Sequence, residues 1–188
     1  MKGFVLATVV ASLEQQYGET FSSDLMMAME KPTGGVYLSV ADYSDNTLDH
    51  LISNAATLLG MSRETLAKVM GVHLFSELIV INPQWIKQNT NAFDLLKSHD
   101  MALNEVVRLA FPGFVAPSFS CVEISPDILE LDYRSAFLPG DMAEGLICAM
   151  FMHFDEQFSI ERRPTEHAVG FNQKIILRQK PNRHKLAD

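Results

Sequence analysis

The chain has 188 residues, of which 47% are hydrophobic, which is enough for one substantial core and little for two independent ones. Its formal charge of -8 opposes binding to phosphate backbones, so the composition argues against a nucleic-acid-binding protein. It has neither an uncharged apolar run of about 18 residues nor a secretory leader pattern, which predicts a cytoplasmic protein without a membrane span.

The first part of the chain has the apolar periodicity of helices. Residues 2–17 place valines and leucines along one face and end at Gly18, and a shorter helix is expected over residues 21–30. Together with the helices that follow, these segments predict a helical lobe over about residues 1–80.

Two further helices have recognisable caps. One is predicted over residues 45–59, with Ser44 as its N-cap and Gly60 as its end, and Ser62 is predicted to cap the next. In that next helix His73 continues the apolar stripe, so its side chain should project toward the core. A hydrogen-bonded core histidine is the favoured interpretation, and a ligand role the lesser one.

A linker turn over residues 83–91 and a short helix over 93–98 lead to a helix predicted over 99–110. Asn104 lies at the border of its apolar stripe. On a helical wheel His99 points about 140° away from Asn104. His99 therefore cannot replace a ligand projected from position 104 without a shift of the helix.

The second part of the chain changes to the alternation of strands. Residues 119–124 and 128–134 are two predicted strands, and the second sends Leu129, Leu131 and Tyr133 to one face. Because only three turn-forming residues join these strands, they are predicted to form an antiparallel hairpin.

One more helix and a second hairpin complete the predicted elements. Asp141 is expected to cap a helix over residues 141–155. Residues 157–163 and 171–178 are predicted to pair as a hairpin, and residues 181–188 to form a frayed tail.

These elements predict one α+β domain over residues 1–188. Its helical lobe is followed by a mixed lobe over about residues 81–180, which contains a four-stranded antiparallel sheet and a packed helix. The two cysteines, Cys121 and Cys148, lack the spacing of a zinc site, so they are expected to be buried thiols and no metal site is predicted.

Six segments of the chain carry a resemblance to a known family: the start MKG, the helix HDMALNEVVRLA, the turn FPG, the strand entry APSF, the strand end YRS and the helix AEGLICAMFMHF. They resemble the heme nitric oxide/oxygen binding family, H-NOX, whose domain also occurs in soluble guanylate cyclase. The resemblance covers nearly the whole chain, and it implies a heme-binding gas sensor domain with the α+β fold predicted above.

The resemblance implies a heme site and also two departures from it. The family binds the iron through a histidine where this chain has Asn104, and a carboxamide is a poor iron donor. Its Tyr-x-Ser-x-Arg motif, which holds the heme propionates, carries over to Tyr133 and Ser135 only, because Phe137 replaces the arginine. This pocket is therefore not expected to bind heme as its relatives do. Asn104 is otherwise expected to be a polar residue on a helix face.

Further positions match those that line or shape the family's heme cavity: Val5, Val9, Leu74, Leu78, Pro117, Met142 and Leu146. Such residues would fill a solid core equally well. The small side chains of Val5, Val9 and Ala102 favour a cavity. Met142 stands where some oxygen-binding relatives have a distal tyrosine, so the chain resembles the members that favour nitric oxide.

Two hypotheses follow from the sequence. In the first, the protein is a heme-based nitric oxide sensor that signals to a separate histidine kinase or cyclic-di-GMP signalling enzyme, a partner class that only the resemblance implies. In the second, it is a heme-free relative that binds another hydrophobic ligand or acts as a protein-interaction module. No motif of a known catalytic site stands out, so the protein is not expected to be an enzyme.

Overall fold

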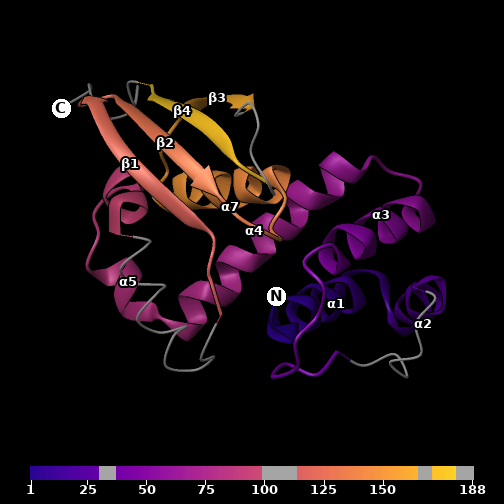
Figure 1. Ribbon diagram of the computed structural model, residues 1–188. Helices are drawn as coiled ribbons and strands as arrows, with labels where there is room; N and C mark the ends of the chain where they lie inside the picture. Colours follow the sequence, from indigo (N-terminus) through magenta and orange to yellow (C-terminus); the bar gives the residue numbers. More distant parts are fainter. Residues whose placement is uncertain (30–36, 99–113, 165–170, 181–188) are drawn as a thin grey trace.

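The computed structural model describes residues 1–29, 37–98, 114–164 and 171–180. The helix predicted over residues 99–110, with His99, Ala102 and Asn104, lies outside them, as does the predicted tail. The elements are α1 (Gly3–Tyr17), α2 (Glu19–Ala28), α3 (Thr47–Leu59), α4 (Arg63–Ile81), α5 (Pro83–Lys87), β1 (Ser118–Ser125), β2 (Ile128–Arg134), α7 (Gly140–His153), β3 (Phe158–Pro164) and β4 (Gln173–Gln179) (Figure 1). Residues 92–98 are also helical.

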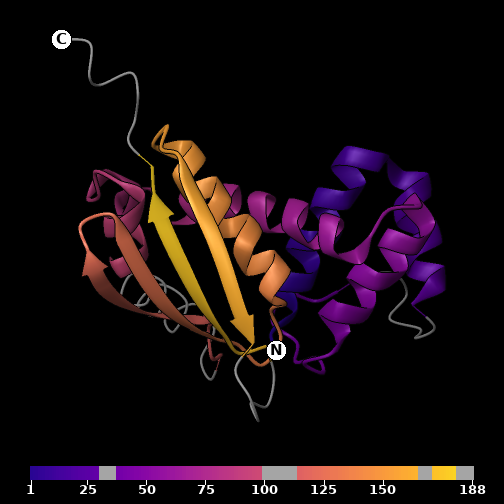
Figure 2. The ribbon, with the colours of Figure 1, turned by 90° about the horizontal axis from the view of Figure 1, so that it is seen from above.

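The helices α1, α2 and α3 gather at one end of α4 and form the helical lobe (Figures 1 and 2). Two of the predicted caps are confirmed. The Thr65 backbone N–H donates to Ser62 Oγ at 3.1 Å at the start of α4, and Gly60 ends α3 with a left-handed φ of 64°. The Ser44 cap is wrong, because α3 begins at Thr47, and the Ser44 hydroxyl instead contacts Asn46 Oδ1 at 2.7 Å.

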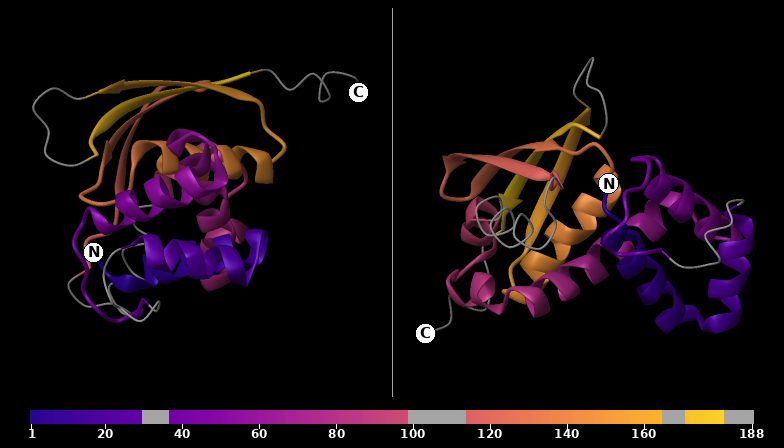
Figure 3. Two further views of the ribbon diagram at one scale, coloured as in Figure 1. Left: turned by 90° about the vertical axis from the view of Figure 1, so that its right-hand side faces the viewer. Right: turned by 60° about the horizontal axis from the view of Figure 1, so that its bottom comes forward.

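The strands form one antiparallel sheet with the order β1-β2-β4-β3. Helix α7 lies against one face of this sheet, as the edge-on view shows (Figure 3). That face carries Leu129, Leu131 and Tyr133, which are fully buried, as their alternation predicts. At the far edge Phe151 of α7 stacks on Phe158 of β3 with ring centroids 4.0 Å apart. The α+β fold class and both hairpins are confirmed.

Helices α4 and α7 cross at two glycines. A Cβ on Gly71 would overlap the carbonyl oxygen of Met142, and a Cβ on Gly145 would overlap that of Lys68. Each helix therefore places a glycine where the backbone of the other comes closest. This crossing joins the helical lobe, through α4, to the helix that supports the sheet.

Several local predictions are wrong for identifiable reasons. Helix α7 begins at Gly140 behind Pro139, so Asp141 lies inside its first turn and makes ion pairs instead of capping it. The expected linker turn contains α5, because Pro83 occupies the first helical position that proline favours. Both cysteine thiols are half-buried instead of buried.

Candidate functional site

The candidate site is an apolar cavity where the start of α1 meets α4, α7, the segment that enters β1 and the segment that leaves β2. Its volume is about 40 Å³, and every described residue that lines it is apolar. The lining residues are Phe4, Val5, Leu74, Leu78, Phe114, Pro117, Phe119, Phe137, Leu138 and Leu146. An apolar cavity of this kind holds apolar molecules in preference to water.

Five of the residues expected from the resemblance line this cavity: Val5, Leu74, Leu78, Pro117 and Leu146. Val9 and Met142 are buried, with exposed fractions of 2% and 0%, but they do not line it. Asn104 lies outside the described residues.

Phenylalanine rings that the sequence did not predict form one wall of the cavity. The ring of Phe114 contacts Phe4 in an edge-to-face arrangement with centroids 5.2 Å apart, and it contacts Phe137 with centroids 5.5 Å apart. Phe137 itself is 3% exposed. The position that the resemblance equates with the arginine of the family motif is thus part of an aromatic cluster. No local sequence pattern predicts such a wall, because its rings come from three segments that are far apart in the sequence.

Tyr133 and Ser135 are both buried and direct their hydroxyl groups at the turn that follows β2. The Tyr133 hydroxyl donates to the Leu138 carbonyl oxygen at 2.7 Å. Ser135 Oγ accepts from the backbone N–H of Phe137 at 3.2 Å and from that of Leu138 at 2.8 Å. Burial raises the pKa of the Tyr133 phenol well above its usual value. The pair therefore stabilises the turn that carries Phe137.

His73 does not project into the cavity. It is half-buried, and its Nε2 lies 2.8 Å from Nε2 of Gln16 on α1. The favoured interpretation of a hydrogen-bonded core histidine is therefore right about the hydrogen bond and wrong about the core, because His73 is half-buried and its partner is an exposed glutamine of α1.

The described residues that line this cavity supply no anchor for heme. The cavity is well below the roughly 300–1,000 Å³ that is typical of pockets for drug-sized ligands. None of the described lining side chains can coordinate iron, and none can pair with a carboxylate. Within the described parts of the chain, no group of three or more His, Cys, Asp or Glu residues could hold a metal ion.

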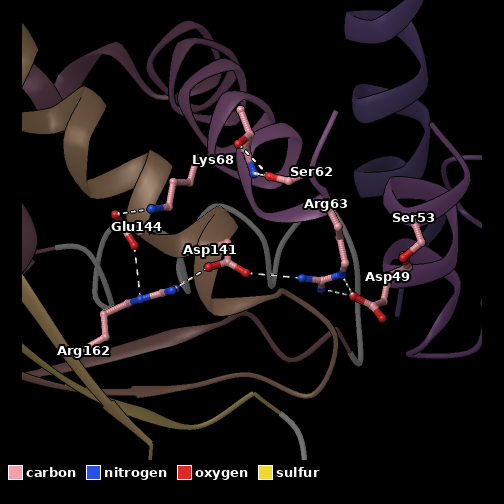
Figure 4. A network of polar contacts seen from close by, with 9 residues as sticks. Asp49, Ser53, Ser62, Arg63, Lys68, Asp141, Glu144 and Arg162 are labelled. Carbon is pink, nitrogen blue, oxygen red and sulfur yellow. Dashed lines mark hydrogen bonds and ion pairs between the residues drawn. The ribbon is translucent and has the colours of Figure 1, made fainter. Parts of the chain in front are cut away.

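A network of ion pairs surrounds the first turns of α7 and connects four elements (Figure 4). Its members are Asp49 on α3, Arg63 and Lys68 on α4, Asp141 and Glu144 on α7, and Arg162 on β3. Arg162 pairs with Asp141 at 2.6 Å and with Glu144 at 3.1 Å, and Lys68 pairs with Glu144 at 2.8 Å. The network thus fixes the start of α7 against both the sheet and α4.

Comparisons with known proteins agree with the fold. The model of the family described as Haem-NO-binding matches residues 2–162. No helix in the described parts of the chain is long and apolar enough to cross a membrane.

Solved H-NOX structures share this fold at low sequence identity. An unliganded Fe(II) H-NOX mutant from K. algicida is similar with a TM-score of 0.85 and 22% identity, over 98% of this chain and 100% of that one. An H-NOX protein from S. oneidensis in the Fe(II)NO state has a TM-score of 0.82 and 19% identity, over 96% of this chain and 99% of that one. A mutant H-NOX from T. Tengcongensis has a TM-score of 0.82 and 18% identity, over 97% of this chain and 100% of that one. No curated protein matches the sequence.

Proposed function

This chain belongs to the heme-NO-binding (H-NOX) family, whose domains are heme-binding sensors, and from that premise we propose that it is a sensor domain that works without heme. Its ligand is a hydrophobic molecule smaller than heme, bound where α1, α4 and α7 meet. The output is a contact with a separate signalling protein, for which the family suggests a histidine kinase or a cyclic-di-GMP signalling enzyme. No catalytic step of its own is proposed.

The burial of Phe137 in the cavity wall carries this proposal. A side chain that is 3% exposed and in contact with another ring cannot be moved aside without a loss of packing. Heme would require that displacement and also a partner for its propionates, at a position that now carries a phenyl ring. Asn104 removes the histidine that the family uses for iron.

A second candidate function is the family's own, a heme-based sensor of nitric oxide. Tyr133 and Ser135 favour it, because their hydroxyls lie together at the end of β2 beside the cavity wall. In that case the two hydroxyls would exchange their bonds to the turn for bonds to heme carboxylates, and the iron would need a ligand other than a histidine at position 104.

Visible absorption spectroscopy distinguishes the two candidates. The protein, produced in cells supplied with a heme precursor, should be purified without a Soret band, and hemin added in equal amount should give only the spectrum of free or weakly associated hemin. A stoichiometric complex with a sharp Soret band that shifts on addition of nitric oxide would overturn the heme-free proposal and establish the second candidate.

A further inference from the structure

A second, larger pocket lies directly outside the apolar cavity. Its volume is about 330 Å³, which is within the range of small-molecule sites. Its lining residues are Met1, Lys2, Asp42, Asp45, Phe114, Val115, Ala136 and Phe137. We refer to it as the outer pocket, and to the apolar cavity as the inner cavity.

The two spaces are separated by two phenylalanine rings. Phe114 and Phe137 line both the inner cavity and the outer pocket. The two rings therefore form the boundary between an apolar space and a space with charged side chains. A ligand in the outer pocket can place an apolar body against these rings and a polar group toward the charged side chains, which suits an amphipathic molecule.

The polar end contains two ion pairs, and in each of them the carboxylate side chain is the more exposed partner. The N-terminal ammonium of Met1 lies 2.8 Å from Asp45 Oδ1, and the Asp45 side chain is 54% exposed. Lys2 Nζ lies 2.8 Å from Asp42 Oδ2, and the Lys2 side chain is 16% exposed, whereas that of Asp42 is 76% exposed. The backbone of Lys2 is fixed by a bridge to that of Asp42, and the next two residues donate N–H groups to Ala41 and Ser39 at 2.9 and 3.0 Å.

This asymmetry favours an anionic ligand. An exposed carboxylate can leave such a pair for water at little cost in free energy. The Lys2 side chain is 16% exposed and packed along its length, so its ammonium would stay at the pocket without its partner. An incoming carboxylate would take the place of Asp42. The amino end of α1, which has no acidic residue in its first turn, adds a favourable electrostatic contribution for an anion.

We propose that the outer pocket is the entrance of the ligand site and that it binds the carboxylate of a small amphipathic monocarboxylate through Lys2, while the apolar body of the ligand lies against Phe114 and Phe137. This inference rests on the proposed heme-free function and names the chemical class of the ligand. It assigns Lys2 a binding role and Asp42 the role of an internal competitor.

The test compares three probes that share one apolar body, by equilibrium dialysis at low ionic strength. These are 3-phenylpropionate, 3-phenylpropan-1-ol and 3-phenylpropylammonium. The wild-type protein should bind the carboxylate in preference to the other two. Lys2→Met should weaken carboxylate binding about tenfold, the effect of one charge-assisted hydrogen bond, and should leave binding of the alcohol unchanged.

The variant Asp42→Asn should change carboxylate binding in the opposite direction to Lys2→Met. It removes the competing carboxylate and should strengthen 3-phenylpropionate binding severalfold. The matched controls are Lys174→Met and Glu130→Gln, which break a similar pair of 2.7 Å between β4 and β2, where Lys174 is 50% exposed. Neither control should alter binding of any probe.

The outcomes separate this inference from the proposed function. Absence of carboxylate binding, a preference for the ammonium probe, or equal binding by wild type and Lys2→Met would overturn the role of Lys2, whether or not heme binds. A stoichiometric heme complex would overturn the heme-free function, whatever the dialysis shows. If the inference and the proposed function are both correct, Lys2→Met should weaken carboxylate binding, Asp42→Asn should strengthen it, and the protein should show no Soret band.

Discussion

Arg63 Nη1 donates to Asp141 Oδ2 at 3.2 Å, and the same guanidinium donates through Nε to Asp49 Oδ1 at 3.0 Å. One side chain at the start of α4 thus joins α3 of the helical lobe to the first turn of α7. Asp141 also accepts from Arg162 of β3 at 2.6 Å. Two cations from different parts of the fold therefore share this one carboxylate, which is only 13% exposed.

Replacing Asp141 should destabilise the fold measurably. The substitution Asp141→Ala removes the shared acceptor, and Arg162 already has one buried nitrogen, Nη1, without a hydrogen-bond partner among the described residues. The expected loss in the free energy of unfolding is about 1–3 kcal/mol, measured by urea denaturation. The control Asp132→Ala breaks an exposed pair with Arg134 and should change stability by about 0.5 kcal/mol or less. Equal effects of the two variants would show that the network contributes nothing beyond an ordinary surface pair.

The crossing of α4 and α7 should not tolerate a methyl group. In Gly71→Ala the new Cβ would overlap the carbonyl oxygen of Met142, so the helices must separate along their whole contact. A loss of roughly 1–3 kcal/mol or more is expected in thermal or urea unfolding, although alanine favours the helical state. The control Ser76→Ala lies at an exposed position of the same helix and should be close to neutral. A Gly71→Ala protein as stable as wild type would contradict the close approach.

Alkaline pH should weaken the fold through its buried phenols. Burial raises the pKa of Tyr133, and burial followed by repulsion from Tyr43 raises that of Tyr37. The folded state holds these protons more tightly than the unfolded chain does. The contribution of the two phenols to the free energy of unfolding is therefore complete below the ordinary tyrosine pKa of about 10, and it is lost as the pH rises toward their folded-state pKa values.

The variant Tyr133→Phe separates this effect from general base denaturation. At neutral pH it should lose about 0.5–1.5 kcal/mol, because the Leu138 carbonyl oxygen loses its donor. Between about pH 10 and 12 its free energy of unfolding should fall less steeply than that of the wild type. The control Tyr17→Phe changes an exposed residue and should keep the wild-type slope. A wild-type slope in Tyr133→Phe would mean that this phenol does not contribute to the alkaline loss.

The sequence predicted the fold because the apolar residues repeat with clear periods. The alternation of Leu129, Leu131 and Tyr133 with polar residues predicts a strand with one buried face, and these three side chains are fully buried on β2. The caps were less predictable. Ser44 and Asn46 are both good N-cap residues, and only the tertiary contacts of α3 decide where the helix begins.

The candidate site was predictable in its chemistry but not in its shape. Apolar residues such as Val5 and Leu146 are compatible with a lined cavity and with a filled core, and the difference depends on rings from distant segments. Phe137 could be identified from the sequence as a missing arginine, but its contact with Phe114 could not. The heme-binding roles of Tyr133 and Ser135 stay predictions, since in the structure both hydroxyls serve the turn.

Introducing the two heme anchors that the resemblance leads us to expect is the most direct test of the site. The variant Phe137→Arg alone should be destabilised, by roughly 1–3 kcal/mol, because it places a guanidinium at a position that is 3% exposed and in contact with the Phe114 ring. The double variant Asn104→His, Phe137→Arg should recover stability when hemin is added, since the heme then supplies carboxylates for the arginine and iron for the histidine.

This double variant should bind hemin with a Soret band and a ferrous spectrum typical of histidine ligation, while the wild-type protein is purified largely heme-free. The matched control is Asn104→His with Phe137→Leu, which enlarges the cavity without supplying a charge. It should bind hemin more weakly than the double variant, because an uncharged side chain at position 137 cannot pair with a propionate. A wild-type protein that is fully loaded with histidine-ligated heme would contradict this account, because the ligand would then have to come from His99 or His73. His73 bonds to Gln16 instead of facing the cavity, and His99 points about 140° from position 104 on a regular helix.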